Sequence, residues 1–155
     1  MKNRTPSPFP PPRGGRVRVG VARKGVYNLL IRLEKDCRLK VGMIGTFQFP
    51  KGYYVYTGSA QNNMEKRIAR HLSHNKKMHW HIDYLLRVAK VLKVVEYAGL
   101  KADECRISRA IGKRPDAKII VTGFGSSDCM CRTHLFFFPE KSKNLLQCSS
   151  LFLKM

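Results

Sequence analysis

The amino-acid sequence predicts an α+β fold, in which short strands and helices share one chain. Runs rich in β-branched and aromatic residues recur along the sequence and are as short as strands usually are. Between them lie stretches whose apolar residues recur every three or four positions, which is the helical period. The first three strand-like runs are separated only by short turns, so they predict an antiparallel meander.

The strands follow one another in a simple order. The apolar run at 25–31 predicts the first strand, and a second is expected over 40–49. Pro50 and Gly52 then favour a tight turn, because Pro fixes one backbone angle and Gly permits a positive φ. The strand 53–57 returns from this turn. Further strands are expected at 91–97, 118–122 and 133–138.

Three helices are expected between these strands. The first begins at Met64, after polar residues at 61–63 that offer an N-cap. The second begins near His79, where the apolar residues that follow have helical spacing. The third is capped by Asp103 and ends at Gly112.

The chain of 155 residues is long enough for one domain that buries a core without disulfides. Residues 1–16 form a basic tail rich in Pro and Arg, which we expect to be disordered. The folded domain is expected to span residues 17–139, and residues 140–155 form a C-terminal tail.

The formal net charge of +20 is the outstanding feature of the composition. Lys and Arg displace the counterions that condense on phosphates, so a nucleic acid is the first expected partner and an anionic membrane surface the second. No apolar run is long enough to span a bilayer, and the N-terminus lacks the apolar segment of a secretory signal. Five cysteines make an odd number and suggest a reducing, cytoplasmic setting.

Residues 52–73 concentrate polar chemistry at a junction between a strand and a helix. The strand carries Tyr56, and the helix places Arg67 and His71 one turn apart. The simpler interpretation is a half-buried strand followed by an amphipathic helix with a solvated basic face. The basic residues of this region that we expect to contact nucleic acid are Lys66, Arg70, His74, Lys76 and Lys77.

The sequences G-V-Y at 25–27 and Y-T-G at 56–58, with the helix M-E-K-R-I-A-R-H, make the chain resemble a GIY-YIG nuclease over residues 23–138. The segments W-H-I-D-Y-L-L and G-F-G-S-S-D-C-x-C-x-x-H-L are similar to a poorly characterised prokaryotic subgroup of that superfamily, found alone or joined to a base-excision glycosylase. Val26 and Thr57 stand where isoleucine is commoner. We expect both side chains to point away from the tyrosine face.

The resemblance implies a small central antiparallel sheet flanked by helices, carrying a phosphodiesterase site with one Mg²⁺ or Mn²⁺ ion. Tyr27 and Tyr56 would lie near the scissile phosphate, with Tyr27 helping to deprotonate the attacking water. Arg67 would hold the phosphate oxygens, and His71 would orient or protonate a group there. Glu104 matches the metal-binding glutamate of the family. These five side chains should therefore converge.

The expected function is that of a metal-dependent endonuclease that hydrolyses phosphodiester bonds in DNA, in repair or in the processing of structured DNA. Two alternatives stay open: a module that binds nucleic acid without catalysis, and a structural RNA-binding protein. The tyrosines also have a simpler interpretation as aromatic residues at the edge of the core. Glu104, likewise, favours the positive end of its helix whatever its function.

Two further segments hold residue types that bind metals. Thiolates with imidazoles are typical of Zn²⁺ sites. However, C-x-C is tighter than the usual zinc spacing, and H-x-H puts two rings on different sides of a helix. Helix caps and buried hydrogen bonds explain these residues as well, so Zn²⁺ is the weaker interpretation. The residues of this second metal or structural cluster are His79, His81, Asp83, Cys129, Cys131 and His134, and we expect Cys37, Cys105 and Cys148 to be isolated.

Overall fold

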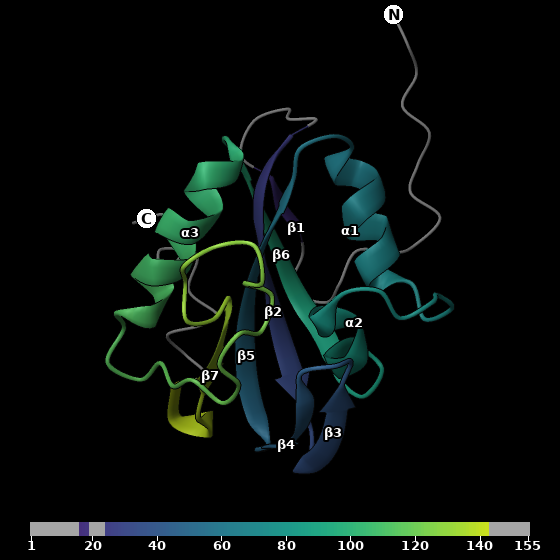
Figure 1. Cartoon of the computed structure of the whole chain (residues 1–155), viewed down its shortest axis with the longest axis vertical. Coiled ribbons are helices and arrows are strands. Elements are labelled where there is room, and N and C mark those ends of the chain that lie inside the picture. The colour runs from purple at the N-terminus through teal and green to yellow at the C-terminus, as the bar shows by residue number, and fades with distance from the viewer. Residues whose placement is uncertain (1–15, 19–23, 143–155) are drawn as a thin grey trace, which may run out of the picture.

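A five-stranded sheet forms the centre of the structure (Figure 1). The strands lie in the order β1-β6-β2-β5-β7, and every neighbouring pair is antiparallel except β1 with β6. This computed structural model describes residues 16–18 and 24–142. The strands of the central sheet are β1 (Arg16–Arg18), β2 (Gly25–Leu33), β5 (Gly52–Ala60), β6 (Lys90–Ala98) and β7 (Leu135–Phe138).

The pairing of β2 with β5 determines which side chains share a face. Gly58 lies opposite Tyr27, and Tyr56 lies opposite Leu29, two residues further along β2. Because side chains alternate between the two faces of a strand, Tyr27, Leu29 and Tyr56 all project from the same face. The two tyrosine rings have their centres 6.4 Å apart. We refer to this side of the sheet as the tyrosine face.

The two residues that depart from the GIY-YIG pattern lie on the opposite face. Val26 packs in the core on that side. Thr57 is buried and donates from Oγ1 to Asn28 Oδ1 at 2.9 Å, while Asn28 Nδ2 donates to the hydroxyl of Tyr97 at 3.1 Å. Both departures therefore leave the tyrosine face unchanged, as expected from the sequence.

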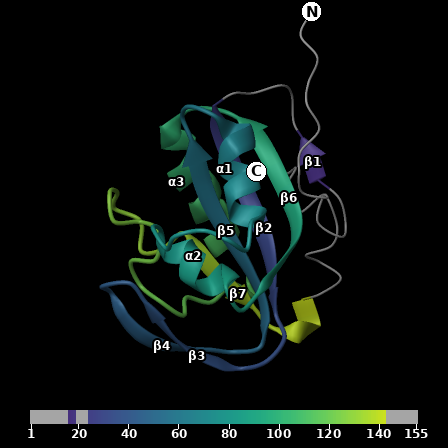
Figure 2. The same ribbon diagram turned by 90° about the vertical axis from the view of Figure 1, so that its right-hand side faces the viewer.

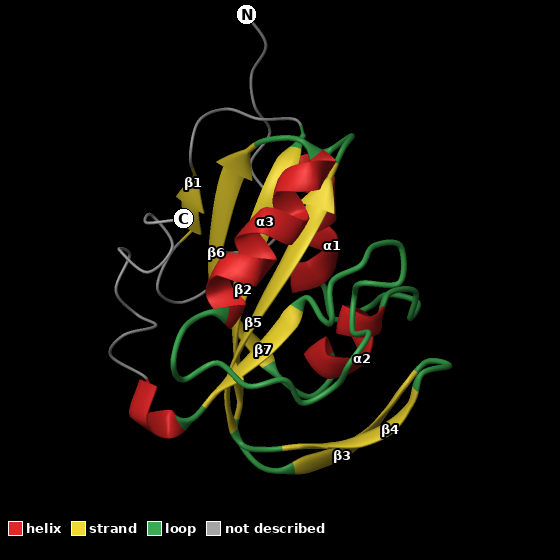
Figure 3. Ribbon diagram, turned by 60° about the vertical axis from the view of Figure 1, so that its left-hand side comes forward, coloured by secondary structure: helices red, strands yellow, loops and turns green. Residues whose placement is uncertain are grey.

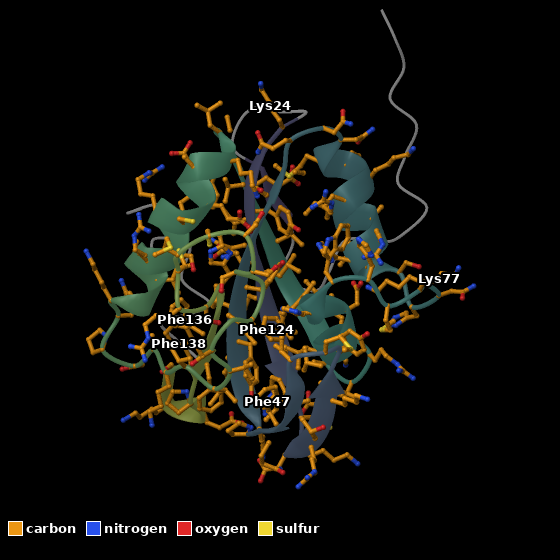
Figure 4. All side chains as sticks on the ribbon, viewed as in Figure 1. Lys24, Phe47, Lys77, Phe124, Phe136 and Phe138 are labelled. Atoms are coloured by element: carbon orange, nitrogen blue, oxygen red, sulfur yellow. The ribbon has the colours of Figure 1, made fainter. Side chains whose placement is uncertain are left out.

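Helices cover both faces of the sheet (Figures 2 and 3). The helices α1 (Met64–Leu72) and α2 (His81–Leu86) pack on the tyrosine face, where Met64, Ile68 and Ile82 join the core. The helix α3 (Lys101–Gly112) packs on the other face. There Phe136 and Phe138 of β7 join the core with Ile107 and Ile111 of the helix. Figure 4 labels both phenylalanines near the lower end of α3. A short 3₁₀ helix, Glu140–Ser142, follows β7.

The expected α+β fold with a central antiparallel sheet and flanking helices is confirmed, but the expected meander is wrong. The run 40–49 is not one strand of the central sheet. The chain instead forms a separate hairpin of β3 (Cys37–Val41) and β4 (Gly45–Phe49) beyond the end of that sheet (Figure 2). Gly42 with a φ of +49° and Gly45 with a φ of +127° make the turn between these strands. The strand β5 consequently pairs directly with β2.

Two other expectations need correction. Residues 118–122 are not a strand, since only Lys118 forms an isolated bridge, to Phe137. The helix α3 begins at Lys101 rather than after Asp103. Asp103 still satisfies the helix end, because its carboxylate accepts the backbone N–H of Leu100 at 2.8 Å.

The start of α1 agrees with the sequence, because the side chain of Asn63 accepts the backbone N–H of Lys66 at 3.0 Å. Of the expected tails, residues 1–15 and 143–155 lie outside the described residues, whereas Arg16 belongs to β1. Among the residues that the structure describes, no helix has both the length and the apolar composition needed to cross a bilayer.

A buried ion pair joins α1 to α2. Both oxygens of Asp83 accept hydrogen bonds from Arg70 at 2.9 Å, and the backbone N–H groups of His79 and Trp80 donate to Oδ2 at 2.8 Å. Burial alone would raise the pKa of Asp83, but these hydrogen bonds outweigh it and hold the pKa below its ordinary value. The Asp83 side chain is fully buried, while that of Arg70 is 27% exposed.

We expect Arg70→Met to lower the free energy of unfolding by about 2–3 kcal/mol in urea denaturation, because the buried Asp83 carboxylate then loses both guanidinium hydrogen bonds and keeps only the more distant Lys76 ammonium, at 3.9 Å. This loss is smaller than the roughly 3–5 kcal/mol expected for a fully buried pair, because the Arg70 side chain is partly exposed to solvent. Arg87→Met, at an exposed arginine beside α2, is the control and should change stability by less than about 0.5 kcal/mol. Equal losses in the two variants would contradict the assignment.

The same ion pair has a definite pH dependence. A lowered carboxyl pKa stabilises the fold above the ordinary value of about 3.9, and this contribution is lost as the pH falls through the native pKa. The stability difference between the wild type and Arg70→Met should therefore shrink below about pH 4. A constant difference down to acid pH would contradict a charged Asp83.

Candidate functional site

A cleft of about 280 Å³ opens where the last residues of β5 lack a partner on one side. The short strand β7 pairs only with Tyr53–Tyr56, so beyond Thr57 the strand β5 is paired with β2 alone. Side chains from both faces of the sheet meet around this free edge. The residues that line the cleft are Tyr27, Tyr56, Ser59, Arg67, His79, Trp80, His81, Lys101, Glu104, Gly125, Ser127 and Asp128.

Tyr27 lies at the base of the cleft and is held by a neighbour from α1. Its hydroxyl lies 2.7 Å from Nε2 of His71, and both side chains are buried. Burial raises the pKa of Tyr27, and the adjacent Arg67 guanidinium opposes part of that rise. Burial lowers the pKa of His71 to about 3, with the Lys76 ammonium acting in the same direction. The imidazole is therefore neutral at physiological pH and the phenol is protonated.

Arg67 reaches the cleft from α1 and is fixed from two sides. Its Nη1 donates to the backbone oxygen of Ser59 at 2.8 Å. Its guanidinium also lies 4.4 Å from the centre of the Trp80 ring, a cation–π distance. A guanidinium has five N–H donors, so one bond to Ser59 leaves capacity for an anion in the cleft.

Glu104 enters the cleft from the first turn of α3, on the other side of the sheet. It is 7% exposed. Its Oε1 accepts a hydrogen bond from Ser59 Oγ at 3.3 Å, and its Oε2 lies 3.4 Å from Nδ1 of His134. Ser59 thus contacts Glu104 through its side chain and Arg67 through its backbone, and it links the two sides of the cleft.

The chemistry around Glu104 suits a divalent cation. The Lys101 ammonium lies between two carboxylates, 3.6 Å from Glu104 Oε1 and 3.0 Å from Asp128 Oδ2. The hydrogen bond from Lys101 lowers the pKa of Asp128, so that carboxyl is charged. The Lys101 side chain is 56% exposed and can withdraw into solvent. Carboxylate oxygens that approach the same cation are a ligand type that Mg²⁺ or Mn²⁺ accepts.

The five basic residues expected to contact nucleic acid differ in their surroundings. Lys66, His74 and Lys77 are exposed, and Figure 4 shows Lys77 at the outer rim of the molecule. Arg70 is engaged by Asp83. Lys76 donates from Nζ to the backbone oxygens of Arg70 and His71 at 3.1 and 3.0 Å. Sequence spacing alone did not reveal these internal partners.

A family model described as a domain of unknown function, DUF123, matches residues 26–155. The chain belongs to the DUF123 family. No curated protein and no solved structure gives a significant match.

In the DUF123 domain, only part of the expected Cys/His cluster comes together. Cys129 and Cys131 lie beside His134, and Cys105 of α3 joins them. The sequence expectation of an isolated Cys105 is therefore wrong. The sequence places Cys105 directly after Glu104, which would have suggested a position near the site. Its spacing from Cys129 and Cys131 has no pattern that would have linked it to their loop.

The other three residues of the expected cluster have separate roles. Asp83 is occupied by Arg70 and by backbone N–H groups. Nδ1 of His81 accepts the backbone N–H of Gly125 at 2.9 Å. His79 is exposed and packs edge-on against Trp80. In the described part of the chain these three do not form a metal-binding group with the cysteines.

The lowered pKa of His71 predicts a loss of stability in mild acid. The unfolded chain takes up a proton near the ordinary histidine pKa of about 6.5, whereas the folded DUF123 domain does not until about 3. Stability should fall by about 1.4 kcal/mol per pH unit below 6.5 through this residue alone. His71→Gln should reduce that slope in urea titrations between pH 6.5 and 4. An NMR titration of the His71 ring with a midpoint above about 6 would contradict the buried neutral imidazole.

Proposed function

We propose that this DUF123 domain is a metal-dependent endonuclease of the GIY-YIG type that acts on DNA. The observation that carries the proposal is the convergence of Tyr27, Tyr56, Arg67 and Glu104, from four different elements, on one cleft. The net charge of +20 supports a polyanionic substrate. The cleft is smaller than typical drug-sized pockets of about 300–1,000 Å³, which suits one phosphodiester group of a polymer that otherwise lies on the surface.

Tyr27 is the proposed base toward the attacking water. Nδ1 of His71 is buried and has no hydrogen-bond partner among the described residues, and a buried N–H without an acceptor is rarer than an acceptor without a donor. We therefore assign the imidazole proton to Nε2, which donates to the Tyr27 oxygen. That hydrogen bond and the Arg67 charge both favour the phenolate over the phenol. Tyr27 then takes the proton of the water when the water attacks phosphorus, and Tyr56 fixes the position of the phosphate beside it.

Arg67 is the proposed phosphate ligand. Its rigid placement between Ser59 and Trp80 directs the remaining N–H groups toward the cleft. Charge accumulates on the non-bridging phosphate oxygens during the displacement, so a preorganised guanidinium stabilises the transition state more than the ground state. Glu104, with Asp128 beside it, would hold the divalent ion. When bound, that ion supplies Lewis-acid stabilisation of the phosphate and of the leaving oxygen.

Cleavage assays test this proposal directly. Incubation with Mg²⁺ or Mn²⁺ and a panel of nicked, branched, abasic and single-stranded DNA should give metal-dependent products. Tyr27→Phe and Glu104→Gln should each lower the rate by about 10²–10³-fold, with little change in DNA affinity. The abasic substrate is included because the resembling subgroup occurs joined to a base-excision glycosylase.

Two matched substitutions serve as controls for this assay. Tyr53→Phe removes a buried phenol hydroxyl from the same strand as Tyr56, but on the face away from the cleft. Glu34→Gln removes an exposed carboxylate far from it. Both should retain the wild-type rate. If wild type and Glu104→Gln are equally inactive on every DNA, while binding stays strongly salt-dependent, the domain binds nucleic acid without catalysis. A preference for RNA in the same binding assay would favour a structural RNA-binding role.

The pH dependence gives a second test of Tyr27 as the base. Because burial keeps the pKa of Tyr27 above the assay range, the reactive phenolate fraction grows tenfold per pH unit. The value of kcat/KM should therefore rise with a slope of about one on a logarithmic scale between roughly pH 6 and 9. Tyr27→Phe should flatten the profile. A plateau beginning near pH 6.5 would indicate a histidine base instead.

A further inference from the structure

Four potential ligands gather beside the cleft, on the side of α3. Cys105 lies on α3, and Cys129, Cys131 and His134 lie at the end of the loop that connects α3 to β7. Their ligand atoms all lie within 4.8 Å of one another. The Nε2 atom of His134 is 3.5 Å from the sulfur of Cys129 and 3.8 Å from that of Cys105.

These separations match those between the ligands of a tetrahedral ion. Zn–S distances of about 2.3 Å and Zn–N distances of about 2.0–2.1 Å place a nitrogen and a sulfur ligand about 3.6 Å apart. A disulfide would need its two sulfurs at about 2.0 Å, and Cys105, Cys129 and Cys131 are all free thiols. We propose that Cys105, Cys129, Cys131 and His134 bind one zinc ion as a structural Cys₃His site.

The groups around the four ligands support the same assignment. Three thiolates and one imidazole are soft and borderline ligands, which favour Zn²⁺ over Mg²⁺. With zinc they carry a net charge of −1, and Arg109 offsets it, since its Nη1 lies 3.7 Å from the sulfur of Cys131. His134 is fully buried, and among the described residues its Nδ1 has no hydrogen bond of good geometry, although Glu104 Oε2 is 3.4 Å away.

Zinc on Nε2 of His134 would give that Nδ1 atom a defined role. Coordination through Nε2 leaves the proton on Nδ1, which then donates to the Glu104 carboxylate, as in the carboxylate–histidine–zinc arrangement of many sites. The zinc site thereby fixes the loop that carries Ser127 and Asp128 and restrains Glu104 within the cleft. This last consequence rests on the proposed nuclease function, whereas zinc binding does not.

Metal analysis of the full chain tests the zinc site without any activity assay. Protein purified under reducing conditions, incubated with zinc and desalted should hold about one zinc ion per chain by mass spectrometry. Cys105→Ser and Cys129→Ser should hold less than about a tenth of an ion. Cys37→Ser is the matched control, because Cys37 lies on β3 outside the cluster, and it should keep the full content. A wild type without zinc, or a Cys105→Ser variant with a full equivalent, would overturn the proposal.

Two measurements guard against variants that fail to fold. Cobalt added to the reduced wild type should give the strong visible bands of a tetrahedral ion and the thiolate-to-cobalt charge-transfer band, and the absence of both would overturn the site. Glu104→Gln should weaken zinc binding about tenfold in a competition with a chelator, as removal of an outer carboxylate does in other sites. Zinc affinity unchanged in Glu104→Gln would refute the His134–Glu104 coupling, whether or not the protein cleaves DNA.

Discussion

The pairing of β2 with β5 places Gly58 directly opposite Tyr27, and the cleft depends on the space that this glycine leaves. A Cβ atom at position 58 would lie 2.5 Å from the Tyr27 hydroxyl and 2.6 Å from the ring carbon that bears it. Neither is a tolerable contact, so any side chain here would push the phenol away from His71. The glycine is therefore required by the position of the Tyr27 hydroxyl, and its backbone freedom is secondary.

The free edge of β5 explains how residues from both faces of the sheet reach one site. In a continuous sheet, a helix on one face cannot deliver a side chain to the other. Here β7 begins only opposite Tyr56, so Glu104 from α3 approaches past its first residue and meets Arg67 from α1 at Ser59. A longer β7 would close that edge. The cleft therefore depends on the short length of β7.

The sequence predicted those features that depend on local pattern. The strands at 25–31 and 53–57 follow from their apolar, β-branched and aromatic content, and the Asn63 cap and the end of α3 at Gly112 follow from helix-capping chemistry. The hairpin at 37–49 was missed because a three-residue turn at 42–44, with Gly42 in it and Gly45 directly after it, interrupts a run of strand-forming residues. The partners of Arg70 and Cys105 could not be found, because each contact joins segments whose spacing along the chain carries no period.

The two sides of the cleft are held by different forces. Tyr27, Tyr56 and the residues of α1 belong to a continuous apolar core, which fixes them by packing. The other side is the loop of residues 113–134, which has no helix or strand apart from the bridge at Lys118. Loops longer than about 12–15 residues without such structure are uncommon in compact domains and are usually functional.

Apolar and polar contacts both hold that loop in place, and Val121 and Phe124 belong to the core. Phe124 anchors its middle in the core, and Ser108 Oγ donates to the backbone oxygen of Thr133 at 3.2 Å. The ion pair of Lys101 with Asp128 is largely exposed and contributes little on its own. Residues 127–132 of the loop are all exposed or half-buried, so this part of the cleft wall should be less stable than the sheet wall. The proposed zinc ion would join Cys105 of α3 to the cysteines of the loop and would make the two walls comparably rigid. This restraint would act one residue away from Glu104.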